Sequence, residues 1–267
     1  MKNKRIAFLG GGNMAEAIIA GLLGGGVSME QNVVASDPSE ARRATLSDKY
    51  GMATTADNAE AVRGADVVVL AVKPQQAAEA LASAKGALSE KQVLVSICAG
   101  LPTAALEAQV PARVARAMPN LPALVRRGVT AICGGARATA EDMALTEKLF
   151  AAVGAVVRLP ESKMNETTAL SGSGPGYVFA FMEALEAAGI AMGIEAATAR
   201  KMAVETVRGA AELAAETGEG PAELRRRVSS KGGTTLAGLA AMEENGFSAA
   251  VAAGMEAARN RAAELAR

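Results

Sequence analysis

The chain has 267 residues, half of them hydrophobic, and its 28 basic residues balance its 28 acidic residues, so that the formal net charge is zero. This length is enough for one or two domains with a sizeable core. The balanced charge gives no support for nucleic acid or an anionic membrane as the main partner. The first apolar run is too short for a signal peptide and no stretch is suited to span a bilayer, so we expect a cytoplasmic protein.

Histidine is absent, and the two cysteines, Cys98 and Cys133, do not have the spacing of metal ligands. Both lie in apolar, strand-like segments, which is typical of reduced core or loop thiols in a cytosolic protein. We therefore expect no metal site. Because histidine is the side chain most often used for proton transfer near neutral pH, the chemistry must use other donors or leave the difficult step to a cofactor.

The first 160 residues predict an α/β domain with a mostly parallel sheet. Continuous Val-, Ile- and Leu-rich runs alternate with helical sequence, which is typical of strands that are covered on both faces. The expected strands are 5–9, 32–37, 66–72, 92–97, 113–118 and 128–133. From residue 163 onward the sequence is Ala-, Glu- and Met-rich with no evident strand. We therefore expect two domains, 1–160 and an all-helical 161–267.

A glycine-rich turn follows the first expected strand. Gly10, Gly12 and Ala15 fit the pattern G-x-G-x-x-G/A. In this pattern the first glycine permits a tight turn, the second lets a pyrophosphate approach the backbone, and the small third residue lets helix and strand pack closely. The helix that begins here offers free N–H groups and a positive dipole end to phosphates. Because a strand precedes the pattern and a helix follows, it predicts a dinucleotide site.

The end of the second expected strand has features that favour each form of the cofactor. An acidic residue there favours the free ribose 2′-hydroxyl of NAD, whereas a nearby arginine accommodates the 2′-phosphate of NADP. Asp37 argues for NAD. Ser36, Arg42 and Arg43 argue for NADP. Asp37 is equally suited to cap the helix expected from Pro38, so the sequence leaves the preference open.

The third and fourth expected strands lead into AVKPQ at 71–75 and ICAGL at 97–101. Ligands of open parallel sheets bind at the carboxyl ends of the strands. Lys73 is therefore placed to meet a phosphate, a ribose or the nicotinamide, and the alternative is an ordinary solvated lysine before a helix.

Two glycine-containing segments interrupt the helical half. ALSGSGPGYVF at 169–179 is either a kink where two helices cross closely or part of a site, and it precedes a helix expected to run to about Ala188. SSKGGTTLAGL at 229–239 supplies hydroxyls and backbone N–H groups before helical sequence expected from Leu236. Such a place suits a carboxylate or a phosphate, although a helix cap with a flexible turn has the same composition.

Five motifs together resemble the pyrroline-5-carboxylate reductase family. They are FLGGGNMAEAII, AVKPQ, MPNLP, LSGSGPGYVF and SSKGGTTLAGL, in the family's order and over nearly the whole chain. The resemblance implies reduction of 1-pyrroline-5-carboxylate to L-proline, the last step of proline biosynthesis, by hydride transfer from NADPH or NADH. It also implies a Rossmann-like dinucleotide domain and a C-terminal helical dimerisation domain, in homodimers that often assemble further, commonly into decamers.

The same resemblance assigns roles to residues of this chain. It implies that Thr235 is catalytic, near the imine nitrogen. The implied substrate contacts are Glu161, Ser230, Gly233, Thr234 and Thr235. The implied cofactor contacts are Phe8, Leu9, Gly10, Gly11, Gly12, Asn13, Ser36, Pro38, Asn58, Ala71, Val72, Lys73, Pro74, Ala99 and Gly100.

Three positions depart from the family's pattern. Lys231 stands where many relatives have proline, and Gly176 stands within a segment where GPAY is common. Arg227 replaces an asparagine that touches the substrate in some members, which leaves the role of Arg227 open.

Two other classes of protein share part of these features. A β-hydroxyacid dehydrogenase has a similar plan, but it needs a catalytic lysine and an asparagine where this chain has Val178 and Met182. A non-enzymatic dinucleotide-binding protein would keep the glycine pattern but would not need the loop at 229–235. Reduction of a protonated cyclic imine needs neither metal nor histidine, since the cofactor carries the difficult chemistry. We therefore expect the reductase.

Overall fold

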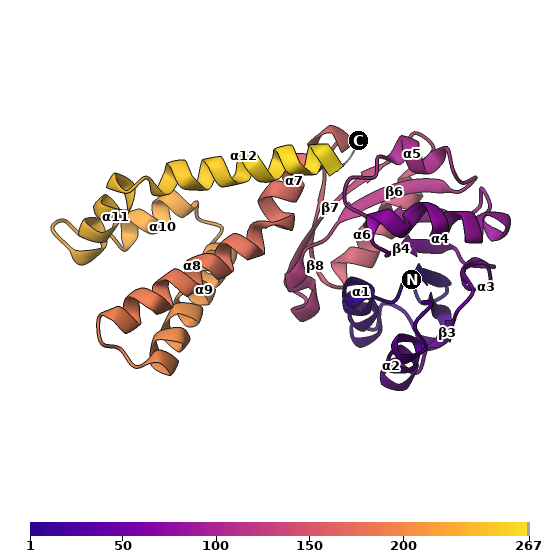
Figure 1. Cartoon of the computed structure of the whole chain (residues 1–267), viewed down its shortest axis with the longest axis horizontal. Helices are drawn as coiled ribbons and strands as arrows, with labels where there is room; N and C mark the ends of the chain where they lie inside the picture. The colour runs from indigo at the N-terminus through magenta and orange to yellow at the C-terminus, as the bar shows by residue number, and fades with distance from the viewer. Residues whose placement is uncertain (266–267) are drawn as a thin grey trace. The chain divides into compact units, whose positions relative to one another are not determined.

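The computed structural model describes residues 1–265, and it contains an eight-stranded sheet (Figure 1). The strands are β1 (Ile6–Leu9), β2 (Val33–Ser36), β3 (Ala53–Thr55), β4 (Val67–Leu70), β5 (Val93–Ser96), β6 (Arg113–Met118), β7 (Gly128–Gly134) and β8 (Gly154–Arg158). Their order across the sheet is β3-β2-β1-β4-β5-β6-β7-β8. Every neighbouring pair is parallel except β6 and β7. The expectation of a mostly parallel sheet is confirmed.

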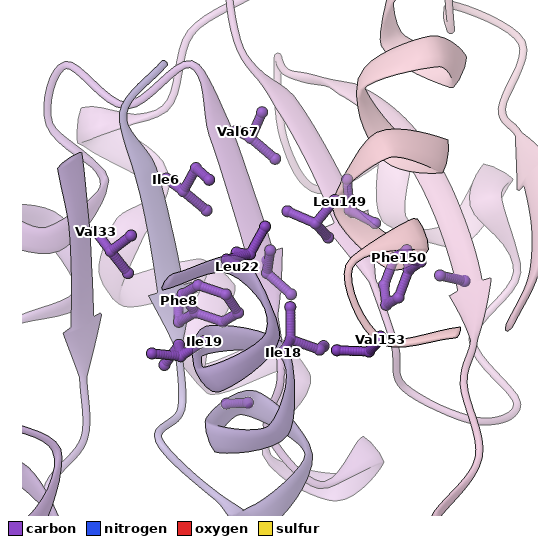
Figure 2. Close-up of a cluster of buried hydrophobic side chains, with 14 of the residues drawn as sticks. Ile6, Phe8, Ile18, Ile19, Leu22, Val33, Val67, Leu149, Phe150 and Val153 are labelled. Carbon is purple, nitrogen blue, oxygen red and sulfur yellow. The ribbon is translucent and has the colours of Figure 1, made fainter. Parts of the chain in front are cut away.

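Helices cover both faces of the sheet because successive strand residues point to opposite sides. The helices of this part are α1 (Asn13–Gly24), α2 (Glu40–Tyr50), α3 (Asn58–Val62), α4 (Ala77–Ala84), α5 (Thr103–Glu107) and α6 (Ala140–Ala151). Ile6 and Phe8 of β1 are buried against α1, α2 and α6, whereas the intervening Ala7 and Leu9 are buried with α3, α4 and α5. Figure 2 shows the first of these two cores, with the side chains of α1 and α6 gathered over the strands.

The strands β3 and β8 were not predicted, and both lie at the edges of the sheet. β3 has three residues, none of them fully buried, and Val157 in β8 is 42% exposed. A strand at the edge of a sheet is less fully buried than a central strand and does not need a continuous apolar run. The run of apolar residues that reveals the central strands is therefore missing in β3 and β8.

The described chain divides into two compact units. The sheet unit comprises Met1–Ser173 together with the C-terminal residues from Ala258, and the helical unit comprises Gly174–Ala257. Helix α7 (Met164–Thr167) and a π-helical turn at Thr168–Gly172 still belong to the sheet unit. The reason is packing, because Met164 is buried together with Ala131 and Cys133 of β7.

The helical unit is built around a pair of long helices. Its elements are α8 (Gly174–Ala191), α9 (Ala196–Thr217), α10 (Pro221–Arg227), α11 (Thr234–Glu244) and the first part of α12 (Phe247–Leu265). Small residues let α8 and α9 approach closely, since a Cβ on Gly189 would lie 3.2 Å from that of Ala199. Within residues 1–265, no helix combines the length and the apolarity that a membrane span requires.

Candidate active site

A pocket of about 740 Å³ lies at the carboxyl ends of β1, β2 and β4. The chain runs from β1 outward to β2 and β3 and then returns to β4 on the other side of β1. Such a reversal of strand order opens a crevice where ligands of α/β sheets bind. The predicted cofactor residues that line it are Gly10, Gly12, Ser36, Pro38, Asn58, Ala71, Val72 and Lys73.

The remaining predicted cofactor residues do not line this pocket. Phe8 and Leu9 are fully buried in β1 beneath it, and Gly11 lies in the same turn as its lining neighbours. Asn13 begins α1, Pro74 begins a 3₁₀ turn, and Ala99 and Gly100 follow β5.

Other lining residues were not among the predicted contacts. They are Asp37, Ala56, Asp57, Gln76, Glu79, Ala80 and Ser83. Asp37 alone had a signal in the sequence, its place after a strand. The others lie on or beside the short helices α3 and α4, which reach the pocket only through the tertiary fold.

Two glycines of the first turn meet different requirements. Gly10 has a φ of +95°, and a Cβ on it would lie 2.8 Å from the carbonyl oxygen of Ala71. Gly12 has an ordinary φ of −64°, and no atom beyond its own residue and its two chain neighbours lies within 4 Å of the place that its Cβ would take. Since Gly12 lines the pocket, its missing side chain leaves room for a ligand against the backbone.

The N-terminus of α1 has no side-chain cap, with Gly12 in the capping position. The neighbouring helices differ, because Ser39 caps α2 and Asp57 caps α3 through their side-chain oxygens. Uncapped N–H groups and the positive end of the helix dipole together form an anion site. The residues present therefore fit the pyrophosphate of a dinucleotide.

Charged side chains of α2 form hydrogen bonds and ion pairs with the glycine turn after β1 and with α1. Arg42 donates to the carbonyl oxygen of Gly11 and pairs with Glu16 of α1. Glu16 also accepts hydrogen bonds from Lys49 at 2.8 Å and from Tyr50 at 3.0 Å. The bond from Lys49, together with those from Arg42 and Tyr50, outweighs the effect of burial and lowers the pKa of Glu16 to about 2.

A chain of polar contacts stiffens the opposite wall. Ser36 is 1% exposed, and its hydroxyl lies 2.6 Å from Oδ1 of Asn58 and 3.2 Å from the carbonyl oxygen of Phe8. The Asn58 amide in turn donates to Ser83 at 2.8 Å. Lys73 is exposed at the rim, and its ammonium makes no ion pair within residues 1–265.

Glu161 lies in the sheet unit, with its carboxylate held by three donors. It accepts from the backbone N–H of Thr103 at 2.7 Å, from the Thr103 hydroxyl at 2.6 Å and from Arg116 at 2.9 Å. Burial alone would raise the pKa of Glu161, but the hydrogen bonds from Thr103 and Arg116 outweigh it and the pKa is lowered. Because Thr103 begins α5, these bonds tie the segment before α7 to the loop after β5.

The two thiols are neutral core groups. Burial raises the pKa of Cys98, and burial with the nearby charge of Glu161 raises the pKa of Cys133 to about 11. Both cysteines are free and buried. Within the part of the chain that the structure describes, no cluster of three or more His, Cys, Asp or Glu residues is arranged to hold a metal ion.

The hydroxyl-rich loop of the helical unit leads directly into α11. Gly232 has a φ of +73°, and a Cβ on Gly233 would lie 2.4 Å from Oγ of Ser230. The prediction that this helix starts at Leu236 is wrong by two residues, because α11 begins at Thr234 with Gly233 in the capping position. Glycine is accepted as an N-cap, and it frees the two threonines to occupy the first turn.

The first turn of α11 resembles that of α1. Gly233 provides no side-chain cap. Thr234 is exposed and Thr235 is half-buried, and neither hydroxyl has a hydrogen-bond partner among residues 1–265. Arg227, whose role the sequence left open, pairs with Glu219 within the same unit.

Comparisons with known proteins identify the family of the chain. The family model for pyrroline-5-carboxylate reductase dimerisation matches residues 161–265, and a model named NADP oxidoreductase, coenzyme F420-dependent, matches residues 5–100. A pyrroline-5-carboxylate reductase of Pseudomonas aeruginosa is 43% identical over 100% of this chain and 98% of its own length. That of Methanosarcina acetivorans is 38% identical over 99% of both chains. The chain belongs to the pyrroline-5-carboxylate reductase family.

Solved structures extend the likeness to three dimensions. The pyrroline-5-carboxylate reductase of Coxiella burnetii is 36% identical and superposes with a TM-score of 0.95 over 100% of both chains. The pyrroline carboxylate reductase of Plasmodium falciparum, solved with NADP bound, is 29% identical with a TM-score of 0.89 over 100% of both chains. The chain is thus an NAD(P)H-dependent oxidoreductase with a Rossmann-like domain, and the two rival classes are set aside.

Proposed function

We propose that this chain reduces 1-pyrroline-5-carboxylate to L-proline, with the pocket beside α1 as the dinucleotide site and the loop before α11 as the substrate site. The observation that carries the proposal is the start of α1 in a chain of this family: it has no side-chain cap, and its N-cap residue Gly12 lines the pocket. The sequence from 1 to 160 would then serve the dinucleotide, and that from 161 to 267 the substrate and dimerisation.

The residues of the pocket bind and orient the dinucleotide in this proposal. The N–H groups at the start of α1 would donate hydrogen bonds to the pyrophosphate, and Gly12 leaves the space for it. Lys73 brings a positive charge to the rim. The bound dihydronicotinamide supplies the hydride that reduces the imine carbon.

The first turn of α11 suits the carboxylate of the substrate. Its backbone N–H groups carry the positive end of the helix dipole. The loop residues Ser230, Gly233 and Thr234 are proposed to hold the carboxylate by charge-assisted hydrogen bonds. Fixing the carboxylate also fixes the ring, and correct orientation lowers the barrier to hydride transfer.

Thr235 is proposed to hydrogen-bond the nitrogen of the imine. Its hydroxyl has no internal partner among the described residues, so that it remains free to donate or accept. Glu161 is proposed to border the substrate as a carboxylate fixed by Thr103 and Arg116.

Substitution of Thr235 tests the substrate site. Thr235→Ala should lower kcat with pyrroline-5-carboxylate by about 100-fold, the scale of a lost proton-transfer or orienting group, while calorimetry shows unchanged dinucleotide binding. Thr235→Ser keeps the hydroxyl and should restore most of the turnover.

A matched control lies in the same unit. The Thr217 hydroxyl bonds the carbonyl oxygen of Leu213 at the end of α9, and Thr217→Ala should leave kcat unchanged. Equal turnover of the Thr235→Ala and unaltered proteins would rule out the role proposed for Thr235.

We also infer a homodimer formed through the helical unit, able to assemble further into a decamer, and a cytoplasmic location. The match of the dimerisation model to residues 161–265 supports self-association. The two free, buried cysteines are typical of a reducing compartment. The balanced charge favours neither nucleic acid nor membrane as a partner.

A further inference from the structure

We propose that this chain prefers NADH to NADPH and that Asp37 sets the preference. The inference rests on the proposed function, because it concerns the same pocket, and it specifies which dinucleotide the pocket takes. Four features of the turn after β2 carry it: the fixed carboxylate of Asp37, and the internal contacts of Ser36, Arg42 and Arg43.

Asp37 presents a fixed carboxylate to the pocket. Its Oδ2 accepts the backbone N–H of Gly11 at 2.9 Å, and its Oδ1 accepts that of Ser39 at 2.9 Å. A carboxylate has about four acceptor positions, so that each oxygen keeps one free position on a side chain that lines the pocket.

This carboxylate can only accept hydrogen bonds. A ribose 2′-hydroxyl has a proton to donate to it, as in other dinucleotide sites with an acidic residue after the second strand. A 2′-phosphate brings further acceptors and negative charge, and like charges at short range repel each other. Asp37 therefore favours NADH and disfavours NADPH by the same chemistry.

Ser36 does not provide a phosphate ligand. Its hydroxyl is buried and directed to Asn58 at 2.6 Å and to the carbonyl oxygen of Phe8. Binding a phosphate there would require breaking these contacts, which hold the wall of the pocket together.

Arg42 is also engaged elsewhere. Its guanidinium donates to the carbonyl oxygens of Gly11 and Gly12 and pairs with Glu16. The side chain is 21% exposed and is held in an ion pair with Glu16. Moving it to a 2′-phosphate would leave the carboxylate of Glu16 with a weaker set of partners.

Arg43 bonds the turn that carries Asp37. Its Nη1 donates to the carbonyl oxygen of Asp37 at 2.7 Å and to that of Pro38 at 3.0 Å. Arg43 is the cation that would bind the 2′-phosphate in a site that prefers NADPH. Substitution of Arg43 therefore distinguishes a preference for NADH set by Asp37 from a preference for NADPH set by Arg43.

The charge of the pocket wall agrees with the proposal. Its lining residues include three carboxylates, on Asp37, Asp57 and Glu79, and a single cation, on Lys73. A wall of this sign opposes an additional phosphate more than it opposes a ribose hydroxyl.

Calorimetric titration of the full-length protein with NADH and with NADPH, in the absence of any imine, tests the preference directly. The Kd for NADH should be lower by about tenfold or more, which corresponds to about 1.4 kcal/mol. Asp37→Ser removes the carboxylate and should reduce this ratio by about tenfold, through weaker binding of NADH and tighter binding of NADPH.

Two further variants complete the test. Asp48→Ser makes the same change at an exposed position of α2, outside the pocket lining, and should leave the ratio unchanged. Arg43→Ala loosens the turn that carries Asp37, so that it should weaken the binding of both dinucleotides by a similar factor and leave the ratio unchanged. Tighter binding of NADPH by the unaltered protein, or loss of NADPH binding in Arg43→Ala alone, would overturn the proposal.

Failure of the proposed NADH preference can be distinguished from failure of the proposed reaction. Tight binding of NADH without formation of proline would count against the proposed reaction and leave the preference standing. Formation of proline with tighter binding of NADPH would count against the preference and leave the reaction standing.

Discussion

Gly10 and Gly12 lie two residues apart in the turn after β1, and they lack a side chain for different physical reasons. At Gly10 the backbone has a φ of +95° and the Ala71 carbonyl oxygen occupies the space of a Cβ. At Gly12 the backbone is ordinary and the space is open toward the pocket. The first glycine serves the fold, and the second serves the ligand.

Alanine at each position should separate these roles. Gly12→Ala should cost no more than about 1 kcal/mol in the free energy of unfolding, the amount by which alanine is the poorer N-cap, but it should weaken dinucleotide binding by about tenfold or more. Thermal unfolding and calorimetric titration measure the two effects.

Gly10→Ala is the matched comparison. It should cost about 2 kcal/mol, because the left-handed backbone and the close carbonyl oxygen both oppose a side chain. The distinction fails if Gly12→Ala destabilises the fold as much as Gly10→Ala, or if it leaves dinucleotide binding intact.

At the scale of elements, ion pairs tie the helices to one another and to the sheet. Glu16 links α1 to three side chains of α2, those of Arg42, Lys49 and the terminal Tyr50. Asp142 links α6 to β6 by a two-bond pair with Arg113, at 2.7 and 2.8 Å. Asp142 also closes a capping box with Thr139 at the start of α6.

The pairing of Glu16 should make stability depend on pH. Its folded pKa of about 2 lies below the ordinary value of 4.5, so that its contribution is fully present above pH 4.5 and is lost as the pH falls toward 2. Glu16→Gln should lower Tm near pH 7, and the difference from the unaltered protein should narrow at about pH 3. A difference that is constant over this range would contradict the assignment.

Loss of the Asp142 carboxylate should destabilise the sheet unit. Asp142 is 1% exposed, and Asp142→Ala removes both the pair with Arg113 and the cap of α6. The expected cost is about 2 kcal/mol by urea or thermal unfolding. Glu141→Ala, at an exposed position of the same turn, should cost less than about 0.5 kcal/mol. Equal effects of the two changes would mean that the pairing contributes nothing.

The sequence predicted the elements that depend on local pattern and missed those that depend on tertiary contacts. The central strands were found because burial on both faces requires continuous apolar runs, as in VVVL of β4. The edge strands β3 and β8 have no such requirement. In the site, spacing alone identified Gly10, Gly12 and Ala15. Glu79 and Ser83 had no such signal, because only the packing of α4 brings them to the pocket.

At the scale of the whole molecule, the helical unit leaves much of its apolar surface uncovered within one chain. Phe179 is 53% exposed, Met192 76% and Met202 56%. Large apolar side chains exposed in such number on one unit are typical of an interface with another chain. Together with the match to a dimerisation model, it indicates that this unit buries its apolar side chains in an assembly.

Sedimentation of the full chain should therefore give a mass of two chains or a multiple of two. Met202→Glu places a charge on α9 and should shift the distribution toward single chains, because an unpaired charge is costly to bury in an interface. Lys91→Glu introduces the same side chain at an exposed position of the sheet unit and should leave the mass unchanged. A single-chain mass for the unaltered protein at micromolar concentration would exclude this assembly.

The reaction itself is tested most directly by supplying 1-pyrroline-5-carboxylate with NADH or NADPH, following oxidation of the nucleotide, and identifying the product by chiral chromatography. The account predicts saturable oxidation with one L-proline formed for each nucleotide oxidised. Folded protein that binds the nucleotide but forms no proline with either cofactor would contradict it.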